Sequence, residues 1–255
     1  MSLLKTTGIC KSFGGLAAIS NLSMEVHERE ILALIGPNGA GKTTLLNLIT
    51  NFTTPDSGSI ILAGQDIAGL ARHKIVKLGI ARTFQSLTVF ENLSVSDNIT
   101  IGHSSQVESS LLDMLNIAAY LRGKKEHRHG LREKIAEVMA FVGLDAGLAK
   151  EPVHVLAMID KKRVAIASAL ASGPSLLLLD EPLAGLNQSE AQELLGLIRK
   201  AKGAGIAVLL IDHNLEAVMS IAERVLVLNF GELIKTGTPE EIICSKRVSE
   251  VYLGK

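Results

Sequence analysis

The residues from Gly36 to Thr43 have the types and the spacing of a site that binds phosphate. They read G-x-x-x-x-G-K-T, and they lie between an apolar run at Ile31 to Ile35 and a helical repeat of leucine and isoleucine. Glycine allows a tight turn and brings backbone N–H groups up to phosphate oxygens, where a Cβ atom would obstruct them. An apolar strand before the motif and a helix after it separate this pattern from an unliganded glycine-rich turn. The stretch therefore predicts a phosphate-binding loop for a nucleoside triphosphate.

The charged and hydroxyl side chains of this loop have separate tasks. Lys42 is expected to act in catalysis by holding the β- and γ-phosphates, and the Thr43 hydroxyl is expected to bind Mg²⁺. The helix that begins near Lys42 adds the positive end of its dipole, which favours a bound anion. Nucleotide contacts are predicted for Gly36, Pro37, Asn38, Gly39, Ala40, Gly41, Lys42, Thr43 and Thr44.

Two carboxylates follow a second apolar run, which extends from Ser175 to Leu179. A buried parallel strand delivers such acids to the carboxyl edge of a sheet, where ligands bind in open α/β folds. Asp180 is placed to hold Mg²⁺ through water, and Glu181 is placed to accept a proton from the attacking water as a general base. The alternative is a buried strand whose acids only mark the next turn.

Three further side chains are candidates whose roles the residues alone leave open. Phe13 lies beside a glycine pair, and it either stacks on an adenine or anchors a hairpin. Gln85 follows a short strand, and it either contacts Mg²⁺ and water at a phosphate or lies in a solvated loop. His213 ends another apolar strand on the edge that carries Asp180, and it either contacts the γ-phosphate or is structural.

Composition limits the class of protein. The 255 residues suit one domain with an elaborated subdomain, and 26 basic residues balance 26 acidic ones, so no global charge favours nucleic acid. No uncharged apolar run approaches the ~20 residues that span a bilayer. The first residues lack a signal-peptide pattern, and Cys10 and Cys244 have no metal or redox spacing. A cytosolic, reduced protein is expected.

The elements that must position these residues alternate between strands and helices, except in the middle of the chain. Strands are predicted at residues 3–10, 21–27, 31–35, 59–62, 80–83, 206–211, 225–228 and 233–236. Helices are predicted after the phosphate loop, at 71–78, at 190–202 and from Pro239 onward, and in the middle at 95–101, 111–121 and 131–142. The basic run at 122–130 is expected to be a solvated loop, and metal binding by its histidines is not expected.

This alternation predicts a single α/β domain over residues 1–255. Residues 1–91 and 156–255 are expected to form a phosphate-loop NTPase core with a mainly parallel sheet and an N-terminal antiparallel β subdomain. Residues 92–155 are expected to form an inserted helical subdomain, because strands are not predicted there.

A resemblance to a known family adds to this reading. Six motifs follow one another along the chain, namely Phe13-Gly14-Gly15, GPNGAGKT, RTFQ ending at Gln85, LLLLDEP, AGLN ending at Asn187, and Asp212-His213. Their order resembles the ATP-binding subunit of an ABC transporter over nearly the whole chain. More narrowly, KSFGGL, ARTFQ, AGLN and the tail GTPEEI with VYLG are similar to the branched-chain amino-acid importer group.

The resemblance implies an ATPase that uses ATP and Mg²⁺ to power import of branched-chain or related amino acids. It implies as partners membrane permease subunits, a second ATPase subunit and, indirectly, an extracytoplasmic solute-binding protein, but no nucleic acid. It places the chain in the cytoplasm, peripheral on the inner face of the cell membrane. By this likeness Phe13 faces the adenine, Gln85 links the nucleotide and its metal to the permease, Asn187 belongs to a loop that crosses the dimer, and His213 is the switch histidine.

One motif departs from the family pattern. The family carries a signature close to LSGGQ, or LSYGQQ in this group, whose serine and glycine N–H groups contact ATP on the other subunit. The matching stretch here is Leu156, Ala157, Met158, Ile159, Asp160 and Lys161. Ala157 removes the hydroxyl, Ile159 replaces a glycine with a β-branched side chain, and Asp160 adds negative charge. Loss of one donor to a charged group costs about 1.5–3 kcal/mol.

The altered signature favours an asymmetric heterodimer. A second subunit with a complete signature would complete one competent site on this chain, whereas a homodimer would have two impaired sites. The alternative is a nucleotide-binding regulatory subunit with little turnover, against which the intact Glu181 argues. A soluble ABC-type ATPase that acts on DNA or ribosomes lacks support, because the chain has no second ATPase half and no basic surplus.

Overall fold

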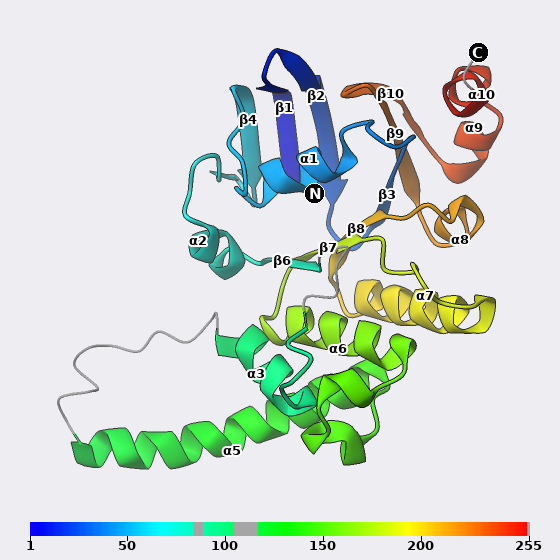
Figure 1. Cartoon of the computed structure of the whole chain (residues 1–255). Coiled ribbons are helices and arrows are strands. Elements are labelled where there is room, and N and C mark those ends of the chain that lie inside the picture. The colour runs from blue at the N-terminus through cyan, green and yellow to red at the C-terminus, as the bar shows by residue number, and fades with distance from the viewer. Residues whose placement is uncertain (84–88, 105–116, 254–255) are drawn as a thin grey trace. The chain divides into compact units, whose positions relative to one another are not determined.

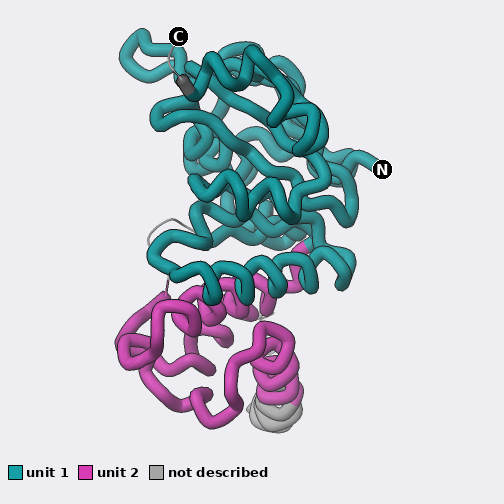
Figure 2. Tube along the Cα trace, turned by 90° about the vertical axis from the view of Figure 1, so that its right-hand side faces the viewer, with its two compact units in different colours: residues 1–85, 175–255 teal, residues 86–174 magenta. Residues whose placement is uncertain are grey.

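The chain forms two compact units. The computed structural model describes residues 1–83, 89–104 and 117–253 (Figure 1). The first unit contains Met1–Gln85 and Ser175–Lys255, and the second contains Ser86–Pro174 (Figure 2). Within the described part of the chain, no helix is both long and apolar enough to cross a bilayer.

A six-stranded sheet forms the core of the first unit, with the order β10-β9-β3-β8-β7-β6. Its strands are β3 (Ile31–Ile35), β6 (Ile80–Thr83), β7 (Leu176–Asp180), β8 (Ala207–Ile211), β9 (Arg224–Asn229) and β10 (Glu232–Gly237). All pairs are parallel except β9 with β10. Every residue of β3, β7 and β8 is buried, because central parallel strands are covered on both faces and need continuous apolar sequences.

An antiparallel sheet forms the rest of the β structure, with the order β2-β1-β4-β5. Its strands are β1 (Ser2–Phe13), β2 (Leu16–His27), β4 (Ser57–Leu62) and β5 (Gln65–Asp66). β1 and β2 are longer than the sequence predicts, because the glycines at 14 and 15 adopt positive φ and form a two-residue turn between the paired residues Phe13 and Leu16. One apolar cluster joins both sheets and the helix after β3, and it includes Leu4, Leu46 and Leu209.

The described residues of the first unit form six helices. They are α1 (Lys42–Ile49), α2 (Arg72–Lys77), α7 (Gln188–Gly203), α8 (Leu215–Met219), α9 (Pro239–Ile243) and α10 (Lys246–Leu253). α7 begins with a capping box, in which the Asn187 side chain accepts from the N–H of Glu190 and the Glu190 side chain accepts from the N–H of Asn187. The predicted α/β class, with its parallel core sheet, antiparallel β subdomain and helical insertion, is confirmed.

The second unit is helical. It contains α3 (Val95–Ser104), α5 (Ile117–Val142), the 3₁₀ turns η1 (Ala146–Lys150) and η2 (Val153–Val155), and α6 (Met158–Ala171). α6 packs against α3 and α5, and the Ser168 hydroxyl donates to the carbonyl of Asn98 at 3.0 Å. Because α6 packs there, this unit extends to Pro174 and includes residues 156–174, which the sequence assigned to the α/β core.

A single helix replaces two elements that the sequence predicts separately. Residues 122–130 lie inside α5, so the expectation of a solvated loop there is wrong. Lysine, arginine and glutamate form helices nearly as well as alanine, and each of the two glycines of this run, Gly123 and Gly130, costs only about 1 kcal/mol in a helix. The predicted helix at 111–121 lies partly outside the described residues, which resume at 117.

Candidate nucleotide-binding site

The loop between β3 and α1 has the backbone of a phosphate cradle. Gly36, Gly39 and Gly41 have φ values of 154°, 79° and 102°. A Cβ atom on Gly36 would lie 2.2 Å from the carbonyl oxygen of Leu228, and one on Gly41 would lie 2.6 Å from that of Ala18. A Cβ on Gly39 would have no protein atom within 4 Å. Two glycines are therefore required by close packing, whereas Gly39 faces open space.

Lys42 is poised over this loop. Its buried ammonium donates to the carbonyl oxygens of Gly36 at 2.7 Å and Pro37 at 3.0 Å. Burial lowers the pKa of Lys42, and the charges of Glu181 and Asp180 oppose that shift. These contacts hold the cation against the loop, where the charges of both carboxylates act on it.

The start of α1 leaves donors for an anion. Its N-cap residue, Gly41, has no side chain, so no N-cap oxygen accepts from the first-turn N–H groups. Thr43 is exposed and Thr44 half-buried on that first turn. The dipole, the N–H groups and the Lys42 ammonium together match a phosphate chain.

The two predicted acids lie at the carboxyl edge of the sheet. Asp180 is the last residue of β7 and pairs in register with Ile211 of β8. Glu181 has φ of +51° and donates its N–H to the Ile211 carbonyl at 2.8 Å. A left-handed residue other than glycine or asparagine is uncommon, and such conformations cluster at functional sites.

His213 lies where the sheet edge should bring it. Its Nε2 atom is 2.8 Å from Oε1 of Glu181, although 32 residues separate them. The neighbouring Asp212 is buried, and its carboxylate accepts from the N–H groups of Leu183 at 2.9 Å and Asn214 at 3.0 Å. Asp212 thus ties the loop after β7 to the loop after β8. A pocket lined by Glu181, Asn187, Asp212 and His213 opens beside these loops.

Sequence reasoning missed Arg82 as a site residue. Its guanidinium donates to Oδ2 of Asp180 at 3.0 Å, and the two side chains are only 5% and 3% exposed. Burial raises the pKa of Asp180 and lowers that of Arg82, and the hydrogen bond between them opposes both shifts. The available signal was an arginine inside a short apolar strand, because arginine is rarely buried without a partner.

The structure describes the surroundings of some of the remaining candidates but not of all. Phe13 ends β1 and is 51% exposed, with the Lys11 ammonium 5.5 Å from its ring centroid. Gln85 lies outside the described residues. The signature residues lie in the second unit at the start of α6, which has Ala157 as an N-cap without a side-chain hydrogen bond. There Asp160 pairs with Arg163 at 2.9 Å.

The donors present fit Mg²⁺. Thr43 and Asp180 offer oxygen atoms, and Mg²⁺ in nucleotide sites is usually held by one or two such groups together with phosphate and water. Among the described residues, no cluster of three or more histidine, cysteine, aspartate or glutamate side chains could hold a metal by itself.

Comparison with known proteins agrees with this geometry. A family model described as ABC transporter matches residues 19–184. The high-affinity branched-chain amino acid transport ATP-binding protein LivG of Salmonella typhimurium is 38% identical and aligns over 99% of this chain and 98% of its own. BraF of Pseudomonas aeruginosa, with the same description, is 35% identical over the same shares.

Solved structures are similar over the full length. A nucleotide-free ATP-binding cassette from an ABC transporter has a TM-score of 0.86 and 28% identity, and covers 100% of both chains. The ADP conformation of MJ1267, an ATP-binding cassette of an ABC transporter, has a TM-score of 0.84 and 28% identity over the same shares.

Proposed function

This chain belongs to the ABC transporter family, and from that premise we propose that it binds and hydrolyses ATP to power import of branched-chain or related amino acids through a membrane permease. The observation that carries the proposal is the position of the Glu181 carboxylate, which lies 2.8 Å from His213 at the carboxyl edge of the sheet. The Lys42 ammonium, at the start of α1, donates to the phosphate-type loop. The full-length likeness to LivG and BraF supports the choice of cargo.

The residues of the site divide the reaction between them. The loop N–H groups and Lys42 bind the phosphates, and Lys42 exchanges the carbonyls of Gly36 and Pro37 for phosphate oxygens. Glu181 accepts a proton from the attacking water, and His213 orients the Glu181 carboxylate. Thr43, Asp180 and Gln85 would hold Mg²⁺, which would supply positive charge to the β- and γ-phosphates. Phe13 supplies an exposed aromatic face for the adenine.

The partners follow from the same premise. We infer that the chain docks as a peripheral subunit on the cytoplasmic side of permease subunits, which receive cargo from an extracytoplasmic binding protein. A second ATPase subunit with a complete signature would supply the trans contacts that Ala157, Ile159 and Asp160 weaken, so a heterodimer is favoured over a homodimer. Asn187, at the start of α7, belongs to the loop that would cross this dimer.

A second candidate function is a nucleotide-binding regulatory subunit with little turnover. Ala157 and Ile159 favour it, because the alanine removes a hydroxyl donor and the isoleucine adds a bulky side chain where the family has a glycine N–H for ATP on a partner. The strained and positioned Glu181 argues for hydrolysis, since a sensor does not need a general base.

Turnover of Mg²⁺-ATP by the purified chain tests the proposal. We compare the wild type with Glu181→Gln and with Ala157→Ser plus Ile159→Gly. We expect low turnover that the signature repair raises, and that Glu181→Gln lowers at least about 100-fold in the repaired background, because it removes a general base. Robust wild-type turnover unaffected by the repair would contradict the heterodimer. Turnover indifferent to Glu181→Gln would contradict the catalytic assignment.

A further inference from the structure

Arg82 forms a buried ion pair that stability alone does not explain. It lies on β6, and its guanidinium donates to Asp180 at the end of β7 with both side chains almost fully buried. Removing two charges from water costs about as much as their attraction returns, so apolar residues of similar size are often equally stable. A buried pair beside a reaction site therefore calls for a second reason.

The other contacts of Arg82 supply that reason. One guanidinium nitrogen donates to Oδ1 of Asn47 at 2.8 Å and lies 3.3 Å from the hydroxyl of Thr50. Asn47 lies on α1, and Thr50 is the C-cap of this helix, whose first turn carries Lys42 and Thr43. The same side chain thus joins the end of β7 to the phosphate-binding helix.

The spacing along α1 shows which face Arg82 contacts. Thr43, Asn47 and Thr50 are separated by four and three residues, so they lie on one face of the helix. Thr43 is exposed at the start of that face, Asn47 is half-buried, and Thr50 is buried. Arg82 therefore contacts the C-terminal part of this polar face. The N-terminal part presents the Thr43 hydroxyl, which is predicted to bind Mg²⁺.

We propose that Arg82 is a positioning residue that fixes the Asp180 carboxylate relative to the Thr43 face of α1, so that both oxygen donors meet Mg²⁺-ATP already placed. This inference rests on the proposed function, because it takes Mg²⁺-ATP as the ligand. Mg²⁺ demands near-ideal octahedral geometry, so a carboxylate that is free to shift binds it poorly. Partners behind a metal ligand typically change metal affinity about 10- to 100-fold when mutated.

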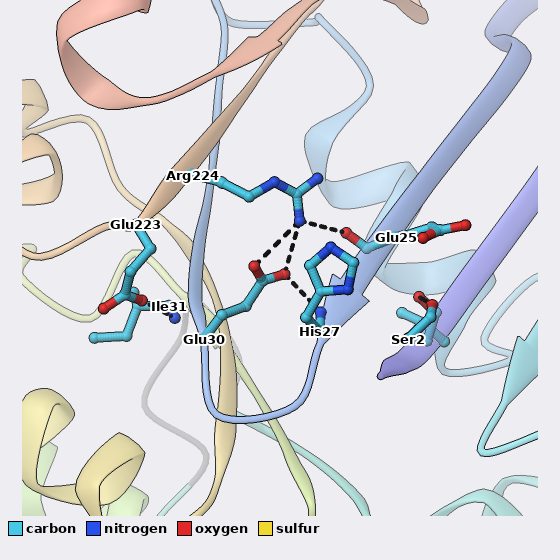
Figure 3. A network of polar contacts seen from close by, with 8 residues as sticks. Ser2, Glu25, His27, Glu30, Ile31, Glu223 and Arg224 are labelled. Carbon is cyan, nitrogen blue, oxygen red and sulfur yellow. Dashed lines mark hydrogen bonds and ion pairs between the residues drawn. The ribbon is translucent and has the colours of Figure 1, made fainter.

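A second arginine of the same sheet provides a matched control. Arg224 begins β9, at the opposite end of the parallel sheet from the phosphate loop. It donates to both carboxylate oxygens of Glu30 at 3.1 Å and lies 3.4 Å from the carbonyl of Glu25, while Glu30 also accepts from the His27 N–H at 2.6 Å (Figure 3). Its side chain is 29% exposed, so its removal disturbs a less buried arginine–carboxylate network of the same sheet without touching the site.

The test measures how much Mg²⁺ nucleotide binding requires. A fluorescent ATP analogue is titrated into wild type, Arg82→Met, Arg82→Lys and Arg224→Met in EDTA. In separate samples without EDTA, Mg²⁺ is titrated into each protein at fixed nucleotide. For Arg82→Met we expect affinity in EDTA within about threefold of wild type, and a Mg²⁺ half-saturation raised at least about tenfold. Arg82→Lys should recover part of the loss, because lysine keeps the charge but not the fork. Arg224→Met should lower the melting temperature and leave the Mg²⁺ requirement within about twofold.

The inference is overturned if Arg82→Met lowers the melting temperature but leaves the Mg²⁺ half-saturation unchanged or lower. Should that variant not fold, Asn47→Ala decides, because it removes a hydrogen bond to α1 and keeps the Arg82–Asp180 pair. An unchanged Mg²⁺ requirement in Asn47→Ala would also overturn it, and a severalfold increase would support it. If Mg²⁺ does not strengthen nucleotide binding by the wild type, the proposed function fails as well. The role of Arg82 alone fails if wild type responds to Mg²⁺ and Arg82→Met responds equally, so the two failures can be distinguished.

Discussion

At the scale of single residues, the phosphate loop contains two glycines that close packing requires and one, Gly39, that no packing contact requires. Gly36 and Gly41 have backbone carbonyls within 2.6 Å of where a Cβ would be placed, so a side chain there would disrupt the packing of the loop. Gly39 has a left-handed φ and nothing nearby. Only a bound nucleotide would give a steric reason to exclude a Cβ at Gly39.

We predict that Gly39→Ala weakens nucleotide binding at least about tenfold while lowering the free energy of unfolding by only about 1 kcal/mol, the cost of a left-handed alanine. The matched control is Gly64→Ala in the β4–β5 turn, where φ is +84° and a Cβ also meets nothing. Gly64→Ala should cost similar stability and leave binding unchanged. Nucleotide titration and chemical denaturation measure both quantities. Equal binding by the two variants would mean that no ligand approaches Gly39.

At the scale of elements, the altered signature leaves the N-terminus of α6 without a side-chain cap. α6 begins after Ala157, whose backbone is extended but whose side chain cannot cap the helix. α2 begins in the same way after Ala71. A serine N-cap would accept from a first-turn N–H, and at Ala157 its hydroxyl would also restore the family's contact to ATP on a partner.

We predict that Ala157→Ser and Ala71→Ser each raise the free energy of unfolding by about 0.5–1 kcal/mol, because each adds an N-cap hydrogen bond. Only Ala157→Ser, combined with Ile159→Gly, should raise turnover of Mg²⁺-ATP. Thermal or chemical denaturation together with a turnover assay separates the two effects. If Ala71→Ser raises turnover as much, the gain comes from general stability and not from the signature.

At the scale of the whole molecule, the chemistry is divided between the two units. The phosphate loop, Asp180, Glu181 and His213 belong to the first unit, whereas the signature lies at the start of α6 in the second. A dimer closed by ATP would need both parts, one from each subunit. The chain carries a well-formed first part and an altered second part, so we expect its self-association to be weak.

We predict that Glu181→Gln alone stays largely monomeric with Mg²⁺-ATP, because hydrolysis is blocked but the signature still lacks the hydroxyl at Ala157 and has the bulky Ile159. Adding Ala157→Ser and Ile159→Gly should shift most of the chain to a dimer at micromolar concentration. Size-exclusion chromatography with light scattering, with and without ATP, measures this shift. A stable ATP-dependent dimer of Glu181→Gln alone would mean that the natural signature works in trans, and the proposed heterodimer would then lose its support.

Local pattern was enough to predict the fold class and most of the strands. The buried strands β3, β7 and β8 are continuous apolar runs, and the glycines, lysine and acids that follow them are adjacent in sequence, so short-range rules apply. The limits of the second unit and the continuity of α5 were not predicted. The limits of the second unit depend on how α6 packs with α3 and α5, which are distant in sequence. The continuity of α5 is compatible with local propensity, because lysine, arginine and glutamate are good helix formers.

By itself, the sequence determined the phosphate loop, the two acids after β7 and the likeness to its family, because each of these is written in neighbouring residues. Only the tertiary structure decided that His213 touches Glu181 and that Arg82 joins Asp180 to α1. Arg82 and Asp180 are 98 residues apart and meet because β6 and β7 pair in the same sheet. Contacts of that kind depend on which strands are neighbours in the sheet, and that order is set by packing between segments that are far apart in the sequence.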